Sequence, residues 1–157
     1  MLGTKVLCEE RPKGVFIEGF ITGTPTPGTV MMLTAATEPI MGRYNWSVYD
    51  VSADGIPALI AVLLEKEHEG KIITDAYVTG DWGYLYCPVA GEKLNMLIQN
   101  PAGTADTYAI GDALMVDDGT GTLVKDSSGV SKCFNIIETK ATYLTADTHL
   151  GCMYSGH

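Results

Sequence analysis

The sequence has few charged residues and little basic charge in particular. Charged residues make up 18% of the 157 residues, below the quarter that is usual for a soluble domain. Ten residues are basic and nineteen are acidic, so the net charge is −9. The basic residues are scattered from Lys5 to Lys140 and form no stripe that could neutralise a run of phosphates. We therefore expect no direct binding to nucleic acid.

Long apolar stretches and an export signal are also missing. The longest apolar run, 56–64, is interrupted by Pro57 and is much shorter than the roughly 20 residues that cross a bilayer. The N-terminus has no basic segment followed by an apolar one, as a signal peptide would. We therefore expect a soluble protein with no membrane partner.

The sequence contains none of the frames that catalysis or nucleotide binding requires. There is no G-x-S-x-G elbow, no S-x-x-K, no G-x-G-x-x-G and no phosphate-binding G-x-x-x-x-G-K-[ST] loop. The histidines stand apart from one another, at His68, His149 and His157. We therefore expect that the protein is not an enzyme.

Metal and disulfide signals are weak. The cysteines form no C-x-x-C pair; they are Cys8, Cys87, Cys133 and Cys152. Buried free thiols explain them better than disulfides do. The stretch 117–121 has glycine where a calcium loop would place oxygen ligands, so a hairpin turn explains it without an ion. We expect no cofactor and no metal.

The sequence does have many glycine and proline residues, 18 and 7 in number, which occur at short intervals along the chain. Short β-rich runs between them predict an all-β fold, a compact sandwich or barrel. Asp54-Gly55 is predicted to close a hairpin, and a short helix or turn is expected at most at 34–39 or 65–69. The predicted strands are 15–21, 29–33, 44–49, 58–64, 71–78, 83–86, 93–98, 113–116, 122–124, 134–139 and 150–154.

One turn pattern recurs along the chain. A glycine is followed by a small or acidic residue and then by an apolar strand, at Gly28-Thr29, Gly80-Asp81, Gly91-Glu92 and Gly111-Asp112. The glycine accepts a positive φ, and the next side chain caps the backbone of the turn. Because the spacing is irregular, the pattern indicates repeated turn chemistry within one β domain and not a solenoid.

The chain is predicted to comprise an N-terminal arm, 1–14, and one β-rich domain, 15–157. The arm has little periodicity and fits either a disordered tail or an extended segment that becomes ordered on a partner. Three aromatic residues alternate along the strand near residue 84, and they form either a core face or a set of interface anchors. The candidate interface residues are Arg11, Pro12, Phe16, Trp82, Tyr84 and Tyr86.

Four stretches carry a resemblance to a known family: 27–31, 54–64, 70–81 and 110–124. Together they resemble the head decoration, or cement, proteins that tailed bacteriophages encode beside the major capsid protein. The resemblance implies a β-tulip-like domain and a homotrimer that binds the major capsid protein. It places the protein in the virion, on the outer capsid surface, after assembly in the host cytoplasm. It implies stabilisation of the expanded head and no catalytic residues.

Two alternatives remain open at this point. The first is another viral structural role, as a minor capsid, head–tail joining or tail protein, which would differ in copy number per virion. The second is a carbohydrate-binding or enzymatic β-sandwich. That alternative predicts an open groove lined by Trp82, Tyr84 and Tyr86.

Overall fold

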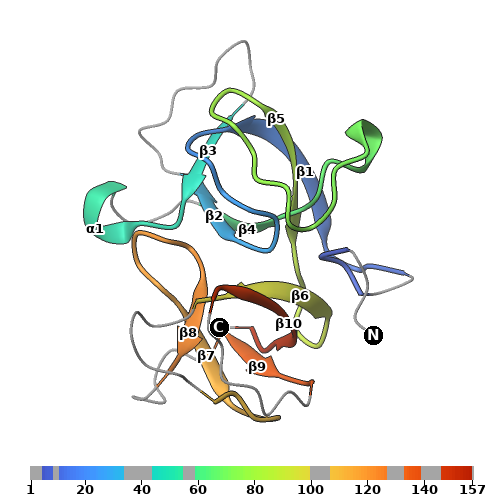
Figure 1. Cartoon of the computed structure of the whole chain (residues 1–157), viewed down its shortest axis with the longest axis vertical. Helices are drawn as coiled ribbons and strands as arrows, with labels where there is room; N and C mark the ends of the chain where they lie inside the picture. Colours follow the sequence, from blue (N-terminus) through green and yellow to red (C-terminus); the bar gives the residue numbers. More distant parts are fainter. Residues whose placement is uncertain are drawn as a thin grey trace.

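Ten short strands make up most of the regular structure in the described part of the chain, which confirms the all-β prediction (Figure 1). The computed structural model describes residues 5–8, 11–33, 44–54, 59–99, 107–126, 133–138 and 146–156. The strands are β1 (Val15–Ile21), β2 (Val30–Leu33), β3 (Asn45–Val48), β4 (Leu59–Leu63), β5 (Trp82–Cys87), β6 (Lys93–Ile98), β7 (Ala113–Val116), β8 (Leu123–Lys125), β9 (Phe134–Ile136) and β10 (Thr148–Tyr154). The helical pieces in these ranges are the single turn α1 (Val51–Asp54) and the 3-10 turn η1 (Glu67–Glu69), and neither has the length or apolar character to cross a membrane.

The strands close into two five-stranded barrels that follow each other along the chain. Strands β1–β5 form barrel 1 and strands β6–β10 form barrel 2, which lie one above the other in Figure 1. In each barrel the first strand pairs in parallel with the third and antiparallel with the fifth. The second strand lies between the third and the fourth in both. The two barrels therefore have the same strand order.

The pairing register is the same as well. Ile21 of β1 pairs with Trp46 of β3, and at the equivalent place Ile98 of β6 pairs with Leu123 of β8. The same equivalence holds for one pairing at each of the other four strand contacts around the barrels. The matching pairs, with barrel 1 first and barrel 2 second, are Ile17–Leu85 and Leu94–Cys152, Leu63–Leu85 and Ile136–Cys152, Met31–Ala61 and Leu114–Phe134, and Met31–Val48 and Leu114–Lys125. The chain thus contains two copies of one barrel, a larger repeat than the turn pattern indicated.

The repeated turn has the geometry that the sequence predicts. The four glycines have φ values of 86°, 91°, 93° and 90°, at Gly28, Gly80, Gly91 and Gly111. In the three acidic copies the carboxylate accepts the amide three residues earlier: Val78 to Asp81 at 2.9 Å, Val89 to Glu92 at 2.8 Å and Ala109 to Asp112 at 2.9 Å. These turns lead into β5, β6 and β7. Each copy therefore reverses the chain and starts a strand, as the pattern predicts.

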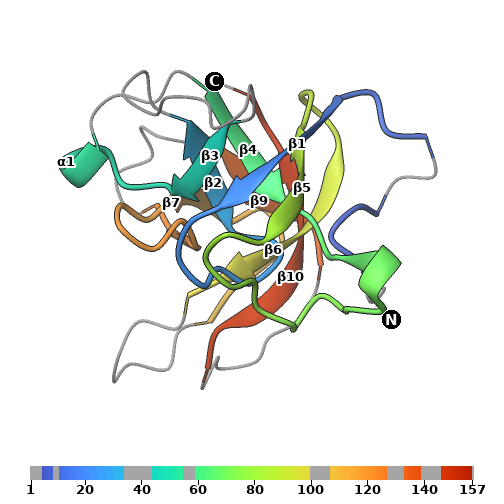
Figure 2. The ribbon, with the colours of Figure 1, turned by 90° about the horizontal axis from the view of Figure 1, so that it is seen from above.

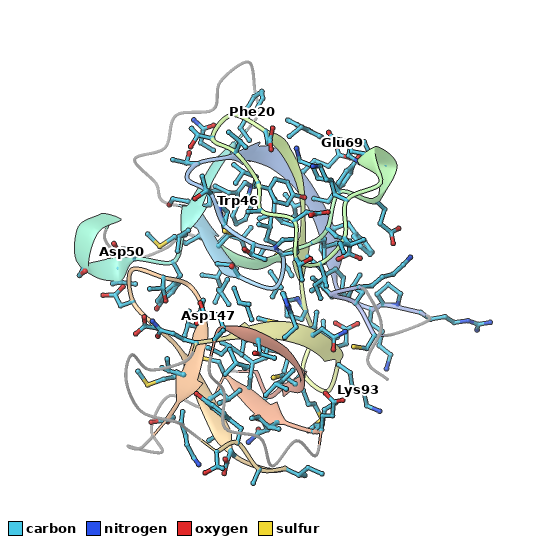
Figure 3. All side chains as sticks on the ribbon, in the orientation of Figure 1. Phe20, Trp46, Asp50, Glu69, Lys93 and Asp147 are labelled. Atoms are coloured by element: carbon cyan, nitrogen blue, oxygen red, sulfur yellow. The ribbon has the colours of Figure 1, made fainter. Side chains whose placement is uncertain are left out.

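Two hydrophobic clusters hold the barrels. The interior of barrel 1 is a cluster of its own around Trp46, Leu63 and Leu85, with Trp46 inside the barrel (Figure 3). The second cluster fills barrel 2 and continues across the junction, because Val62 and Tyr86 on the outer face of β4 and β5 pack against it. Barrel 1 therefore rests on barrel 2 by its outer face. The single domain expected over 15–157 stays a prediction.

Hydrogen bonds from one turn of each barrel to the other barrel hold the junction together. The amide of Val30 in barrel 1 donates to the carbonyl of Gly121 in the β7–β8 turn, at 2.8 Å. In return the amide of Leu97 in barrel 2 donates to the carbonyl of Gly28, and the His149 ring bonds the adjacent Pro27 carbonyl at 2.7 Å. Each barrel thus inserts a glycine-containing turn against the other. The predicted hairpin turn at 117–121 is confirmed in this place.

The first described residues belong to the fold and are not a free tail. Lys5–Cys8 lies along β6, where the Asn95 amide donates to the Val6 carbonyl at 2.7 Å and the Cys8 amide donates to Lys93 at 3.2 Å. The Val6 side chain is fully buried. The disordered-tail alternative is wrong for this segment. It is extended, but it lies against the barrels of its own chain.

Two local predictions are wrong. Residues 71–78 form no strand, because the Asp75 carboxylate accepts the Ile72 amide at 2.8 Å and closes a turn there. Asp54-Gly55 does not close a hairpin between β3 and β4, because β2 lies between these strands and pairs with both. Asp54 ends α1, and Gly55 lies outside the described residues, as does the helix considered at 34–39. The turn expected at 65–69 is present as η1.

Candidate functional site

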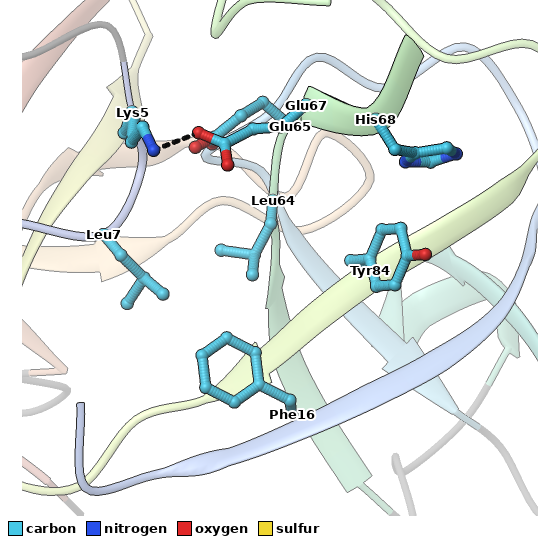
Figure 4. A pocket seen from close by; sticks show the side chains of 8 residues that line it. All are labelled: Lys5, Leu7, Phe16, Leu64, Glu65, Glu67, His68 and Tyr84. Carbon is cyan, nitrogen blue, oxygen red and sulfur yellow. Dashed lines mark ion pairs between the residues drawn. The ribbon is translucent and has the colours of Figure 1, made fainter. Parts of the chain in front are cut away.

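An open groove of about 520 Å³ lies beside the junction of the two barrels (Figure 4). Its walls come from four parts of the chain: the segment along β6, the start of β1, the end of β4 with η1, and the middle of β5. The lining residues are Lys5, Leu7, Phe16, Leu64, Glu65, Glu67, His68 and Tyr84.

The floor of the groove is apolar and aromatic. Phe16 of β1 and Tyr84 of β5 lie on the outer face of barrel 1, because their strand positions alternate with interior residues. Phe16 is 53% exposed, and its ring packs 4.9 Å from that of the buried Tyr86. In Figure 4 Leu7 and Leu64 complete the apolar lining opposite Phe16. Together these side chains give the groove a continuous apolar floor, and contiguous exposed apolar surface is what marks a binding site.

The rim of the groove is acidic. Glu65 is 8% exposed, and its carboxylate accepts the Val6 amide at 3.0 Å. Glu67 forms an ion pair with Lys5, and the hydrogen bond and charge of Glu67 raise the pKa of Lys5. Lys66 is buried, and its ion pairs are with Asp81 at 2.7 Å and Glu69 at 3.5 Å and not with the carboxylates that line the groove. Among the described lining residues, Lys5 is therefore the single cation against two carboxylates.

His68 stands at the outer end of this rim. Its ring lies 5.3 Å from the ring of Tyr84 in an edge-on arrangement. The side chain is 48% exposed and comes within 3.5 Å of Glu69. This agrees with the solvated position that its charged neighbours in the sequence indicate.

Tyr86 lies at the junction of the two barrels beneath the groove, and its side chain does not reach the groove surface. Its hydroxyl donates to the Glu92 carboxylate at 2.6 Å and accepts the Gly14 amide at 2.6 Å. The same carboxylate accepts the amides of Lys13, at 2.5 Å, and Val89. Burial and the bond to Glu92 raise the pKa of Tyr86 to about 12. Burial alone would raise the pKa of Glu92 too, but the hydrogen bonds outweigh it and hold the pKa below its usual range.

The six predicted interface residues separate into different places. Phe16 and Tyr84 meet in the groove. Trp82 lies farther along β5, half-buried, with its ring 5.2 Å from that of Phe20. Tyr86 is fully buried, so its side chain offers no surface to a partner. In the segment before β1, Arg11 is exposed and Pro12 is half-buried.

The sequence did not reveal most of the groove. Leu7 and Leu64 are ordinary apolar residues far apart in the chain, and only the fold brings them opposite Phe16. The alternating glutamates at 65, 67 and 69 were visible in the sequence, but lysines next to them were expected to balance them. Lys66 does pair with Glu69, at 3.5 Å, but its shorter ion pair, to Asp81 at 2.7 Å, is a tertiary contact that no local pattern indicates.

The groove is suited to holding an extended polypeptide by side-chain contacts. Its floor can take an apolar side chain, and its rim can take a basic one. Within the described ranges, no three His, Cys, Asp or Glu side chains gather as they would around a metal ion. The four cysteines are present as thiols; Cys133 and Cys152 are buried as expected, Cys87 is half-buried and Cys8 is exposed.

No protein-family model matches the chain, and no curated protein matches its sequence. The resemblance to phage head decoration proteins therefore stays an expectation drawn from the turn-and-strand patterns.

Proposed function

We propose that this protein is a non-enzymatic structural protein of a tailed-bacteriophage head, which binds the outer capsid surface and stabilises the expanded shell. The observation that carries the proposal is the exposed apolar start of β1 beside an acidic groove. Val15 and Phe16 are 62% and 53% exposed on a strand that a closed barrel holds in place. The identity of the partner, the major capsid protein, comes from the resemblance described above.

Binding through such a surface needs no chemistry beyond burial and charge. An aromatic side chain that is already fixed on a rigid strand loses little freedom on binding, so the entropic cost of ordering it is small. A protein that binds the expanded lattice and not its precursor stabilises the expanded state by mass action. Many copies on one shell multiply contacts that are individually modest.

The remaining parts of the proposal follow the same family resemblance. We propose a homotrimer with β-tulip-like modules, seated at three-fold or quasi-three-fold positions of the capsid. The acidic rim formed by Glu65 and Glu67 would face a basic side chain of the capsid protein. A net charge of −9 supports a protein partner over nucleic acid.

The test is binding to shells assembled from the major capsid protein of the same genome, in expanded and precursor forms. We expect wild-type protein to bind expanded shells in many copies and precursor shells weakly. Phe16→Ala should weaken binding about tenfold or more, because it removes a central aromatic anchor. The folding stability of the Phe16→Ala variant should differ little from that of the wild type, because Phe16 is half-exposed.

A matched control is Ile110→Ala in barrel 2. Ile110 is 58% exposed, comparable to Phe16, but lies outside the groove, so its loss should change binding less than about twofold. Failure of the wild-type protein to bind either shell would overturn the proposal. Binding of a few copies at one vertex would favour a head–tail joining role instead.

A further inference from the structure

The two barrels differ at one edge of their first strands. In β6 the backbone groups that face away from β10 are satisfied one after another. The Lys93 carbonyl accepts the Cys8 amide, and the amides of Asn95, Leu97 and Gln99 donate to Val6, Gly28 and Leu123, respectively. Extended chain therefore lines the described length of this edge.

The matching edge of β1 is satisfied only at its far end. The amide of Phe20 donates to Tyr44 at 3.0 Å and that of Thr22 donates to Trp46 at 2.8 Å, which match the bonds of Leu97 and Gln99. Glu18 is the counterpart of Asn95, and Phe16 is the counterpart of Lys93. Because backbone groups alternate between the two edges of a strand, the Glu18 amide and the Phe16 carbonyl point away from β5.

Among the described residues, nothing pairs with this part of β1. Its pairing with β3 covers Phe20 and Ile21, and no acceptor for the Glu18 amide is found in the described ranges. The side chains agree, since Val15, Phe16 and Glu18 are exposed. Seen from above, the N-terminal end of β1 runs away from β3 (Figure 2). An open edge of this kind is a template for one more strand.

The fold itself shows what fits such an edge. On β6 the occupant is Lys5–Cys8, an extended segment that forms an antiparallel bridge from Leu7 to Leu94. On β1 the exposed carboxylate of Glu18 stands beside the edge and Phe16 stands next to it. A strand there would meet an acidic and an aromatic side chain. A segment with a basic residue opposite Glu18 fits this chemistry, and a second copy of this acidic chain fits it poorly.

We propose that the open edge of β1, from Phe16 to Glu18, accepts an extended basic segment of the capsid protein as an added antiparallel strand. The choice of the capsid protein as source rests on the proposed function. The added strand would occupy on barrel 1 the place that Lys5–Cys8 occupies on barrel 2. The backbone would supply the alignment, and Glu18 would select the basic segment.

Amide hydrogen exchange on the free wild-type protein tests the open edge directly. The Glu18 amide should exchange about 100-fold faster than the Asn95 amide, its bonded counterpart. When the protein is bound to expanded shells, the Glu18 amide should become protected and the Asn95 amide should not change. Protection of Glu18 in the free monomer would overturn the proposal, because the edge would then be filled within the chain. Protection that rises with protein concentration alone would show a second copy as the occupant and would overturn it too.

Substitution tests the same edge in binding. Glu18→Pro removes the amide donor at a position where the strand edge is open, and should weaken binding to expanded shells about tenfold. Glu18→Ala keeps the amide and should weaken it less, by about threefold, through loss of the charge. Equal binding by wild type and Glu18→Pro would overturn the added strand while leaving the proposed function intact. No binding by the wild type would overturn both.

Discussion

The two barrels share strand order and register, yet their first strands meet very different surroundings. The β6 strand is buried at every residue after Lys93, whereas β1 is exposed at Val15, Phe16 and Glu18. The difference arises from what covers each strand. On β6 the segment Lys5–Cys8 and the turn at Gly28 supply the cover, while on β1 the corresponding place is open among the described residues. Two barrels of one register thus differ in the cover of their first strand, which is lined by extended chain in β6 and exposed at its start in β1.

The sequences of the two strands fit these surroundings. From Leu94 to Ile98, β6 is apolar except for Asn95, the pattern of a strand buried on both faces. The Asn95 side chain contacts the segment that covers β6, because its amide group donates to the Lys5 carbonyl at 2.6 Å. The start of β1 instead carries Glu18 among exposed residues. A charged residue on an open edge discourages uncontrolled pairing between copies.

The largest effect that we expect comes from breaking the contact between the barrels at Gly121. Its φ is +64°, and a Cβ there would lie 2.3 Å from the Val30 carbonyl oxygen. Gly121→Ala should therefore cost about 3 kcal/mol or more of unfolding free energy, measured by denaturant titration. Gly119→Ala in the same turn is the control, because its φ is +93° but its nearest neighbour would be 3.7 Å away. It should cost only about 1 kcal/mol, and equal losses would contradict the close approach.

A smaller effect should separate the covered edge from the open one. Val6→Ala removes two methyl groups from a fully buried side chain, and we expect a loss of about 2 kcal/mol. Val15→Ala makes the same change at a side chain that is 62% exposed at the start of β1, so the loss should stay below about 0.5 kcal/mol. Similar losses from both variants would show that Lys5–Cys8 is not held as described. Because Val6 is part of the core, point variants are better tests of binding than removal of residues 1–14.

The smallest effect concerns acid stability and the carboxylates of the repeated turn. The pKa of Asp81 is lowered by the bond from Lys66 and then by the Val78 amide. In Glu92 and Asp112 burial would raise the pKa, but hydrogen bonds outweigh it and lower the pKa in both. Each group therefore stabilises the fold above its pKa in the unfolded chain, about 4. This stabilisation is lost as the pH falls through the lower pKa of the folded state.

Urea unfolding between pH 7 and pH 2 measures this loss. Glu92→Gln should cost about 1–2 kcal/mol at pH 7 and should flatten the fall in stability below pH 4. Glu18→Gln, at an exposed carboxylate on β1, should leave the profile as in wild type. A wild-type profile that stays flat to pH 2 would contradict the role of these carboxylates.

Much of the local structure could be predicted from the sequence. Strand β6 was predicted with its observed bounds, and the glycine turns at Gly91 and Gly111 have the predicted positive φ and capping. These features depend on residues that are close in the chain. The strand predicted at 71–78 is wrong because its β-branched residues favoured extension, while Asp75 closes a turn through a single side-chain bond. A pattern of residue types does not say which of two local interactions prevails.

The candidate site could be predicted only in part. Phe16 and Tyr84 were proposed for an interface and do lie in the groove, whereas Tyr86 was proposed with them and is fully buried. Tyr84 and Tyr86 lie on the same face of β5, so the two-residue period cannot distinguish them. The difference is that Tyr86 lies nearer the second barrel and bonds Glu92.

The sequence by itself determined the all-β class, the turns that start three of the strands, and the acidic charge that disfavours nucleic acid. These follow from backbone preferences and summed charge, which neighbouring residues or composition decide. Only the tertiary structure decided that these turns belong to two barrels, and that the strands of both barrels pair in the same register. It also decided that Lys5–Cys8 covers β6 and that no described segment covers the equivalent edge of β1. Strand partners far apart in the chain are chosen by which faces must be buried, and that choice is made by the whole fold.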